Sequence, residues 1–223
     1  MGSEQQDIHA ARAFYDRISR VYDLLSDASE HESRDRGLTL LAPAAGEAIL
    51  EIGFGTGHSL VVLARAVGPT GRVSGLDLSE GMARVASNRL EEAGLVDRVE
   101  LRVEAAPPLP WPNASFDAVT MSFTLELFPD DVIPELLAEI RRVLRPGGRL
   151  GVVSMSAVPQ GERESAITHT YKWLHRHFPH IVDCRPIDAP AHLRSTGFAS
   201  QQQVELSMWT LKVLALVAVP ESA

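Results

Sequence analysis

The stretch ILEIGFGTGHSL, residues 49–60, places three glycines at alternate positions directly after an apolar run that carries one acid, Glu51. The glycines are Gly53, Gly55 and Gly57, which read G-x-G-x-G. A glycine-rich turn between a strand and a helix lets a ligand approach the backbone closely, because no side chain stands in the way. This pattern therefore predicts a ligand-binding loop.

The spacing of the loop indicates which ligand it holds. The dinucleotide fingerprint G-x-G-x-x-G would need glycine at position 58, which is His58. An acid two residues before the first glycine would also repel a pyrophosphate. S-adenosylmethionine carries an ammonium and a sulfonium and no phosphate, so a nearby carboxylate can help hold its amino-acid portion. We therefore expect S-adenosylmethionine as the cofactor, bound by the loop residues Glu51, Gly53, Phe54, Gly55 and Gly57.

A second acid, Asp77, ends the next β-rich run, 20 residues after Gly57. A carboxylate there can accept hydrogen bonds from both hydroxyls of a ribose. NAD would need the same acid, and it is the pair of Glu51 with Asp77 that favours S-adenosylmethionine. Further cofactor contacts are expected at Leu78, Met82, Glu104, Ala105 and Ser122. For Leu78 and Met82 the alternative is a place in the core, and for Glu104 it is a solvated charge at a strand end.

From residue 48 onward, short β-rich runs alternate with helical patterns, which is typical of parallel strands joined by crossover helices. Strands are expected at 48–53, 72–78, 99–105, 116–123 and 149–156. Ser79 is the expected N-cap of a helix over 80–94, and RPGG (145–148) is expected to close a helix over 132–144. Residues 201–209 and 211–220 leave no room for a crossover helix, so we expect an antiparallel pair. The predicted fold is α/β, a doubly wound Rossmann-like sheet of seven strands, mostly parallel with an antiparallel C-terminal pair.

The chain has 223 residues and no linker-like composition shift, which favours one domain. We divide it into an N-terminal helical lid (1–45), a cofactor-binding core (46–156), an acceptor-side insertion (157–200) and the antiparallel strand pair (201–223). The net charge of -8 argues against a nucleic-acid partner. The single cysteine, Cys184, and a start without a basic or apolar leader favour the cytoplasm.

The first 25 residues carry apolar side chains at spacings of three or four, which predicts an amphipathic helix. Three placements are open for it: packed on the core, lying on a membrane surface, or closing over a pocket. The opposite face mixes acids with arginines, whereas membrane-surface helices favour Lys and Arg there, so we favour a lid. Tyr15 and Tyr22 lie seven residues apart on it and are expected to face the cofactor, with Tyr22 also a candidate catalytic residue.

The insertion supplies His169 and His175 as further candidate catalytic residues, in the segment THTYKWLHRHF. A general base helps when the acceptor is a hydroxyl or a phenol-activated carbon, and an amine needs it less. Each of these histidines could equally be an ordinary surface or packed residue. One cysteine without an HExxH-type pair gives little support for a metal, so we expect none.

The chain resembles the class I S-adenosylmethionine-dependent methyltransferases over nearly its whole length. The motifs EIGFGTG, GLDLSEGM, LPWPNASFDAVTMSF and RRVLRPGGRL stand in the order of that family. Within it, YDRISRVYDLL before the loop and RVLRPGG after it are similar to the ubiquinone/menaquinone C-methyltransferase branch (methyltransferase type 11). The chain departs from that branch at Ser26 and Ser154, where asparagine and an acid are usual, and in SFTLELF, where arginine and asparagine are usual.

The resemblance implies an enzyme that transfers a methyl group from S-adenosylmethionine to a small or lipophilic acceptor. A quinol-like ring and an amine-bearing lipid or metabolite are the two acceptor classes it suggests, and C-, O- and N-methylation all stay open. Peripheral contact with a membrane and the oligomeric state are open as well. The alternatives are a non-catalytic S-adenosylmethionine-binding or regulatory protein of the same fold, and an NAD-dependent enzyme.

Overall fold

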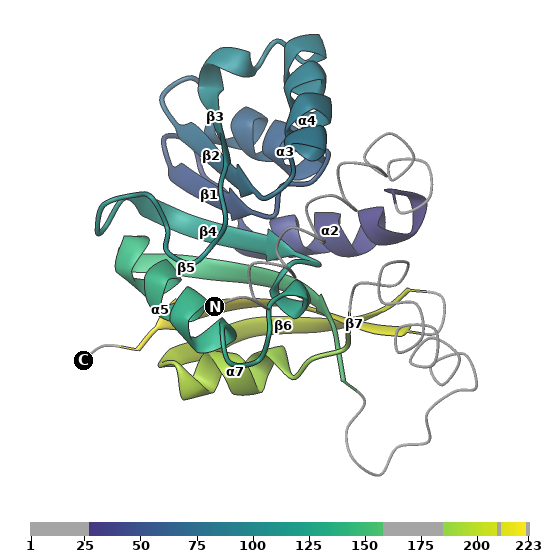
Figure 1. Cartoon of the computed structure of the whole chain (residues 1–223), viewed down its shortest axis with the longest axis vertical. Coiled ribbons are helices and arrows are strands. Elements are labelled where there is room, and N and C mark those ends of the chain that lie inside the picture. The colour runs from purple at the N-terminus through teal and green to yellow at the C-terminus, as the bar shows by residue number, and fades with distance from the viewer. Residues whose placement is uncertain (1–26, 158–184, 209–210, 222–223) are drawn as a thin grey trace, which may run out of the picture.

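The computed structural model describes residues 27–157, 185–208 and 211–221, which include one seven-stranded sheet in the order β3-β2-β1-β4-β5-β7-β6 (Figure 1). The strands are β1 (Ala48–Ile52), β2 (Arg72–Asp77), β3 (Val99–Val103), β4 (Phe116–Ser122), β5 (Leu144–Met155), β6 (Phe198–Met208) and β7 (Leu211–Pro220). The first five pair in parallel, and β7 runs antiparallel between β5 and β6. This confirms the predicted mostly parallel sheet with its antiparallel C-terminal pair.

The order of the strands places a topological switch between β1 and β4. From β1 the chain moves outward through β2 to β3, and then returns to place β4 against the other side of β1. At such a point the crossover connections diverge, which leaves a crevice beyond the carboxyl ends of the two strands. We call the edge where the five parallel strands end the carboxyl edge; it is where a ligand is expected.

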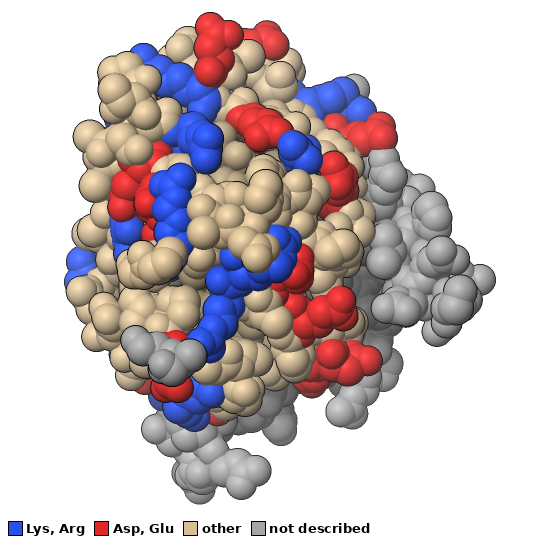
Figure 2. All heavy atoms as spheres, turned by 90° about the vertical axis from the view of Figure 1, so that its left-hand side faces the viewer, with Lys and Arg blue, Asp and Glu red and all other residues tan. Residues whose placement is uncertain are grey.

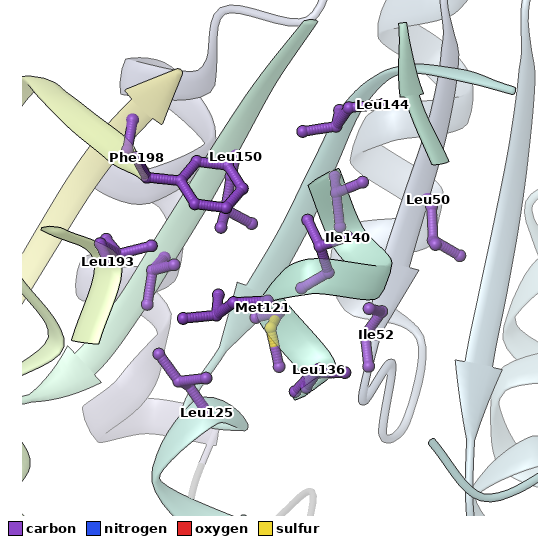
Figure 3. Packing of buried hydrophobic residues seen from close by; sticks show 14 of the residues in the cluster. Leu50, Ile52, Met121, Leu125, Leu136, Ile140, Leu144, Leu150, Leu193 and Phe198 are labelled. Atoms are coloured by element: carbon purple, nitrogen blue, oxygen red, sulfur yellow. The ribbon is translucent and has the colours of Figure 1, made fainter. Parts of the chain in front are cut away.

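Helices cover both faces of the sheet (Figure 1). They are α2 (Asp27–Leu41), α3 (His58–Val67), α4 (Glu80–Glu92), α5 (Ile133–Val143) and α7 (Ala189–Ser195), with two short 3-10 helices, η1 (Val96–Arg98) and η2 (Leu125–Leu127). Buried residues of α5, η2 and α7 share one apolar cluster with β1, β4 and β5, and Figure 3 shows Leu125, Leu136, Ile140 and Leu193 within it. Residues of α2, α3 and α4 form a second cluster with the opposite face. The sheet is therefore doubly wound, as predicted.

Helix α2 runs along β5 in the opposite direction. A Cβ added at Gly37 would collide with Val153, and one added at Gly151 would lie 3.0 Å from Leu41 Cδ1. The Arg149 guanidinium, near the start of β5, donates a 2.6 Å hydrogen bond to the carbonyl oxygen of Leu41. The amino-terminal part of α2 must therefore lie beside the carboxyl edge. The helix belongs to the region expected as a lid, but residues 1–26 lie outside the described residues, and the lid stays a prediction.

Two strands begin earlier than expected, β5 by five residues and β6 by three. Helix α5 ends at Val143 and β5 begins at once with Leu144, so RPGG lies inside the strand span and does not close the helix. The cause is local, since Pro146 disfavours helical backbone before it, and Leu144 is already extended with φ -71° and ψ 138°. The pairing of β4 with β5 shifts its register between Phe116 and Ala118, and this shift accommodates the additional residues between Leu144 and Arg149. At the other end, β6 begins at Phe198 and not at residue 201.

Figure 2 shows one face of the molecule, on which Lys and Arg side chains are interspersed with Asp and Glu side chains. Several arginines of the described segments make ion pairs, including Arg142 with Glu139 (2.7 Å), Arg145 with Asp117 (2.6 Å) and Arg149 with Glu47 (2.8 Å). Among the described residues, none of the helices has the length and apolar character needed to cross a membrane.

Candidate functional site

The glycine loop joins β1 to α3 at the carboxyl edge, and each of its three glycines has a positive φ: 73° at Gly53, 51° at Gly55 and 83° at Gly57. Two of them are required by packing. A Cβ at Gly53 would collide with Thr124, and one at Gly57 would lie 2.8 Å from the Cβ of Ala86. A Cβ at Gly55 would meet nothing within 4 Å. Gly55 therefore presents its backbone to open space, as a ligand-binding position requires.

Asp77 connects the end of β2 to this loop. Its Oδ2 accepts a 2.8 Å hydrogen bond from the backbone N–H of Gly55, and its Oδ1 accepts one of 2.9 Å from the N–H of Ser79. The Ser79 hydroxyl in turn accepts a 3.1 Å hydrogen bond from Met82 N–H, which confirms Ser79 as the N-cap of α4. Because each carboxylate oxygen can accept more than one hydrogen bond, Asp77 can orient the loop and bind hydroxyl groups together.

Glu51 lies at the end of β1 with only 2% of its surface exposed. Burial raises the pKa of this carboxyl to about 8, a shift that the Ser59 hydroxyl and Arg34 oppose and Asp77 reinforces. Its Oε2 has no hydrogen-bond partner among the described residues. Near pH 7 the ligand-free protein therefore favours the neutral acid, and a bound cation would favour the carboxylate. This fits a site for a positively charged ligand better than a site for a pyrophosphate.

The other predicted cofactor residues differ in their placement. Phe54 is buried, and its ring packs against β2, where a Cβ on Gly75 would lie 2.8 Å from it. Only the backbone of Phe54 is therefore placed to contact a ligand at the glycine loop. Met82 is also buried, which agrees with the alternative of a core role, whereas Leu78 is half-buried.

Glu104 and Ala105 are exposed just past the end of β3. The backbone N–H of Glu104 donates a 3.1 Å hydrogen bond to Asp77 O, which places it beside the loop's acid. Ser122 is half-buried at the end of β4. The structure therefore brings Glu51, the three glycines, Asp77, Glu104 and Ser122 to the same edge of the sheet.

Four predicted site residues, Tyr15, Tyr22, His169 and His175, lie outside the described residues. Their roles stay predictions.

Two residues of the site were not predicted. Thr124 packs against Gly53 and donates a 2.9 Å hydrogen bond to Ser122 O, so it connects the glycine loop to the start of η2. Glu126, within η2, is 1% exposed and accepts a 3.0 Å hydrogen bond from Met155 N–H at the end of β5. The signal in the sequence was a single acid among apolar residues in SFTLELF.

Comparison with known proteins shows which family and which solved structures the chain resembles. The family described as "Methyltransferase domain" matches residues 49–148, which run from β1 into β5. The ubiquinone/menaquinone biosynthesis C-methyltransferase of Hydrogenovibrio crunogenus is 32% identical over 160 residues, covering 70% of this chain and 62% of that protein. The demethylmenaquinone methyltransferase of Lactobacillus johnsonii is 33% identical over 156 residues, covering 68% and 62%. The chain thus spans less than two thirds of the length of these curated relatives.

Among solved structures, the geranyl diphosphate C-methyltransferase of Streptomyces coelicolor, in complex with Mg²⁺, geranyl diphosphate and S-adenosyl-L-homocysteine, has a similar fold. The TM-score is 0.70 at 19% identity, over 85% of this chain and 78% of that one. The family match includes all three glycines, both acids and the end of β4, so it covers the carboxyl ends of β1 to β4 but not that of β5.

Proposed function

The chain belongs to the class I S-adenosylmethionine-dependent methyltransferases, and from that membership we propose that it transfers a methyl group from S-adenosylmethionine to a small or lipophilic acceptor. The observation that carries the proposal is the position of Glu51, the open backbone at Gly55 and Asp77 around one loop at the topological switch. An acid for the amino-acid portion, an unobstructed backbone and an acid for the ribose are what this cofactor needs.

The cofactor would supply a methyl group on a positively charged sulfur. The chain's own contribution to such an in-line displacement is to align the acceptor with the methyl group and to exclude water. Gly55 lets the backbone approach the cofactor, Asp77 orients the loop and is placed to accept from the ribose, and Glu51 provides a buried counter-charge. The acceptor would then bind near the ends of β4 and β5, where the structure has Ser122, Thr124 and Glu126.

A quinol-type ring is our first candidate for the acceptor. The support comes from relatives at 32–33% identity whose names describe ubiquinone/menaquinone C-methylation and demethylmenaquinone methylation. An amine-bearing lipid or metabolite is the second candidate, because the chain departs from the quinone branch at Ser154 and in SFTLELF.

The test is methyl transfer from S-adenosylmethionine labelled in its methyl group. The purified protein is incubated separately with reduced short-chain demethylmenaquinone and with phosphatidylethanolamine vesicles, and the organic phase is counted. Label in the quinol supports the first candidate, and label only in the vesicle lipid supports the second. If S-adenosylhomocysteine binds but no label reaches either acceptor, the proposed acceptor class is wrong and a non-catalytic binding protein becomes the better account.

A further inference from the structure

Glu126 is a buried acid with one oxygen left unused by the described part of the fold. It lies in η2, directly after Leu125, which is fully buried and packs near Met121 and Leu136 (Figure 3). Glu126 itself is only 1% exposed, so its carboxyl lies inside the protein. Its Oε1 accepts the 3.0 Å hydrogen bond from Met155 N–H, while its Oε2 has no hydrogen-bond partner among the described residues.

Glu126 lies two residues after a side chain that packs against the glycine loop. Thr124, two residues earlier, fills the space that a side chain at Gly53 would occupy. On the other side, Met155 ends β5. The Glu126 carboxyl is therefore hydrogen-bonded to the end of β5, two residues after the threonine that packs against the glycine loop, and it lies where the proposed function puts the acceptor.

A second buried polar atom, near the end of β5, also has no hydrogen-bond partner among the described residues. Ser154, the residue before Met155, is fully buried, and its Oγ makes no hydrogen bond to any residue of the described ranges. Leaving a polar group buried and unpaired costs about 1–3 kcal/mol, and more for a charged group. Two such groups, one in η2 and one near the end of β5, indicate that their partner is a ligand with hydrogen-bonding groups and not another part of the described fold.

The charged groups that act on Glu126 do not neutralise it. Glu30 of α2 carries the same charge and disfavours its ionisation. Arg185 favours it, but the guanidinium is held by Asp130 at 2.8 Å and by Phe128 O at 2.8 Å. The neighbours on β5, Ser154 and Met155, carry no charge.

We propose that Glu126 is a catalytic residue that contacts the methyl acceptor and takes a proton from its hydroxyl or amino group during transfer. The inference rests on the proposed function. For a hydroxyl or amine, the lone pair of the acceptor atom forms the bond to the methyl carbon, the carbon–sulfur bond breaks with its electron pair left on sulfur, and the acceptor's proton passes to Glu126 Oε2. For a quinol, Glu126 takes the hydroxyl proton while the ring carbon forms the new bond; the hydrogen on that carbon then leaves as a proton and the oxygen is reprotonated.

The environment suits this role. Burial raises the pKa of Glu126 to about 8, with Met155 N–H lowering it and Glu30 raising it. A general base works best when its pKa lies near the working pH, and it typically contributes about 10²–10⁴-fold to the rate. The ionised, active fraction should therefore increase as pH rises through about 8.

The decisive variant is Glu126→Gln, whose amide oxygen can still accept from Met155 N–H but cannot take a proton. The matched control is Glu135→Gln, an exposed acid in the first turn of α5, nine residues after Glu126. Affinity for S-adenosylhomocysteine is measured by calorimetry, and methyl transfer to reduced short-chain demethylmenaquinone and to phosphatidylethanolamine is measured from pH 6 to 9.

We expect Glu126→Gln to bind S-adenosylhomocysteine within twofold of wild type and to lose on the order of 100-fold in transfer rate. Its remaining rate should no longer increase through pH 8, Glu126→Asp should recover part of the rate, and the control should match wild type. A variant that keeps its rate within threefold, or that keeps the rise with pH, would show that Glu126 is not the base. If the wild type methylates neither acceptor, the proposed function itself is wrong, and the role assigned to Glu126 falls with it.

Discussion

Asp77 and Gly55 lie 22 residues apart in the chain, and the Asp77 carboxylate accepts a 2.8 Å hydrogen bond from the Gly55 backbone N–H. The end of β2 therefore fixes the shape of the loop that follows β1. Gly55 is also the glycine with open space beside it, so under the proposed function the same acid that orders the loop would hold the ribose. Cofactor affinity and loop order should consequently depend on one side chain.

Asp77→Ala should remove most of the affinity for S-adenosylhomocysteine. Hydrogen bonds to a charged group are worth about 1.5–3 kcal/mol each, so losing one or two predicts a decrease of at least roughly tenfold. Calorimetric titration measures it, with Asp97→Ala, in the exposed turn η1, as the control. Affinity unchanged within twofold would mean that Asp77 does not hold the ribose.

Gly55→Val should abolish cofactor binding in a folded protein, since a branched side chain would occupy the space beside the loop. Gly94→Val is a close control, because Gly94 also has a positive φ, 68°, and open space around it, but lies after α4. Both substitutions impose similar backbone strain, of about 1–2 kcal/mol. Comparable thermal stability with loss of binding only in Gly55→Val is the expected result. Equal binding by the two variants would contradict the role of the loop.

S-adenosylmethionine should release protons when it binds near pH 7. Glu51 is neutral there in the free protein because burial raises its pKa to about 8, and a bound cation should lower that pKa. Titrations in two buffers of different ionisation enthalpy give the number of protons released. Glu51→Gln should release fewer; if it releases as many as wild type, Glu51 does not respond to the cofactor.

Burial of Glu126 should make stability depend on pH. The pKa of Glu126 is about 8 in the folded protein and near 4.5, the ordinary value of a glutamate, when the chain is unfolded. Between these values the folded state holds a proton that the unfolded state has lost, so the contribution to stability is complete below pH 4.5 and is lost as pH rises through 8. One pKa unit corresponds to about 1.4 kcal/mol, so the loss should reach a few kcal/mol.

Denaturant unfolding at pH 5 and pH 8.5 measures this effect. Wild type should lose more stability than Glu126→Gln over that interval, because the amide has no proton to lose. Equal losses in the two proteins would show that Glu126 is not held as a neutral acid.

The local spacing of residues in the sequence was enough to predict four features: the glycine loop, the acid at Asp77, the N-cap at Ser79 and the antiparallel end of the sheet. The side-chain direction of Phe54 was not, since a loop residue has no periodicity to show which way it points. Glu126 was also missed. Its burial depends on β5, which follows it in the chain, and on the packing of η2, so a single acid in an apolar stretch was a local signal but did not show that the side chain is buried. The N-terminal lid, expected over residues 1–45, stays a prediction.

The most direct test of the central claim is a calorimetric titration of the wild-type protein with S-adenosylhomocysteine and, in parallel, with NAD. The arrangement of Glu51, Gly55 and Asp77 predicts saturable binding of S-adenosylhomocysteine at one site per chain, competed by S-adenosylmethionine, and no binding of NAD at the same concentrations. Binding of NAD without binding of S-adenosylhomocysteine would contradict the account.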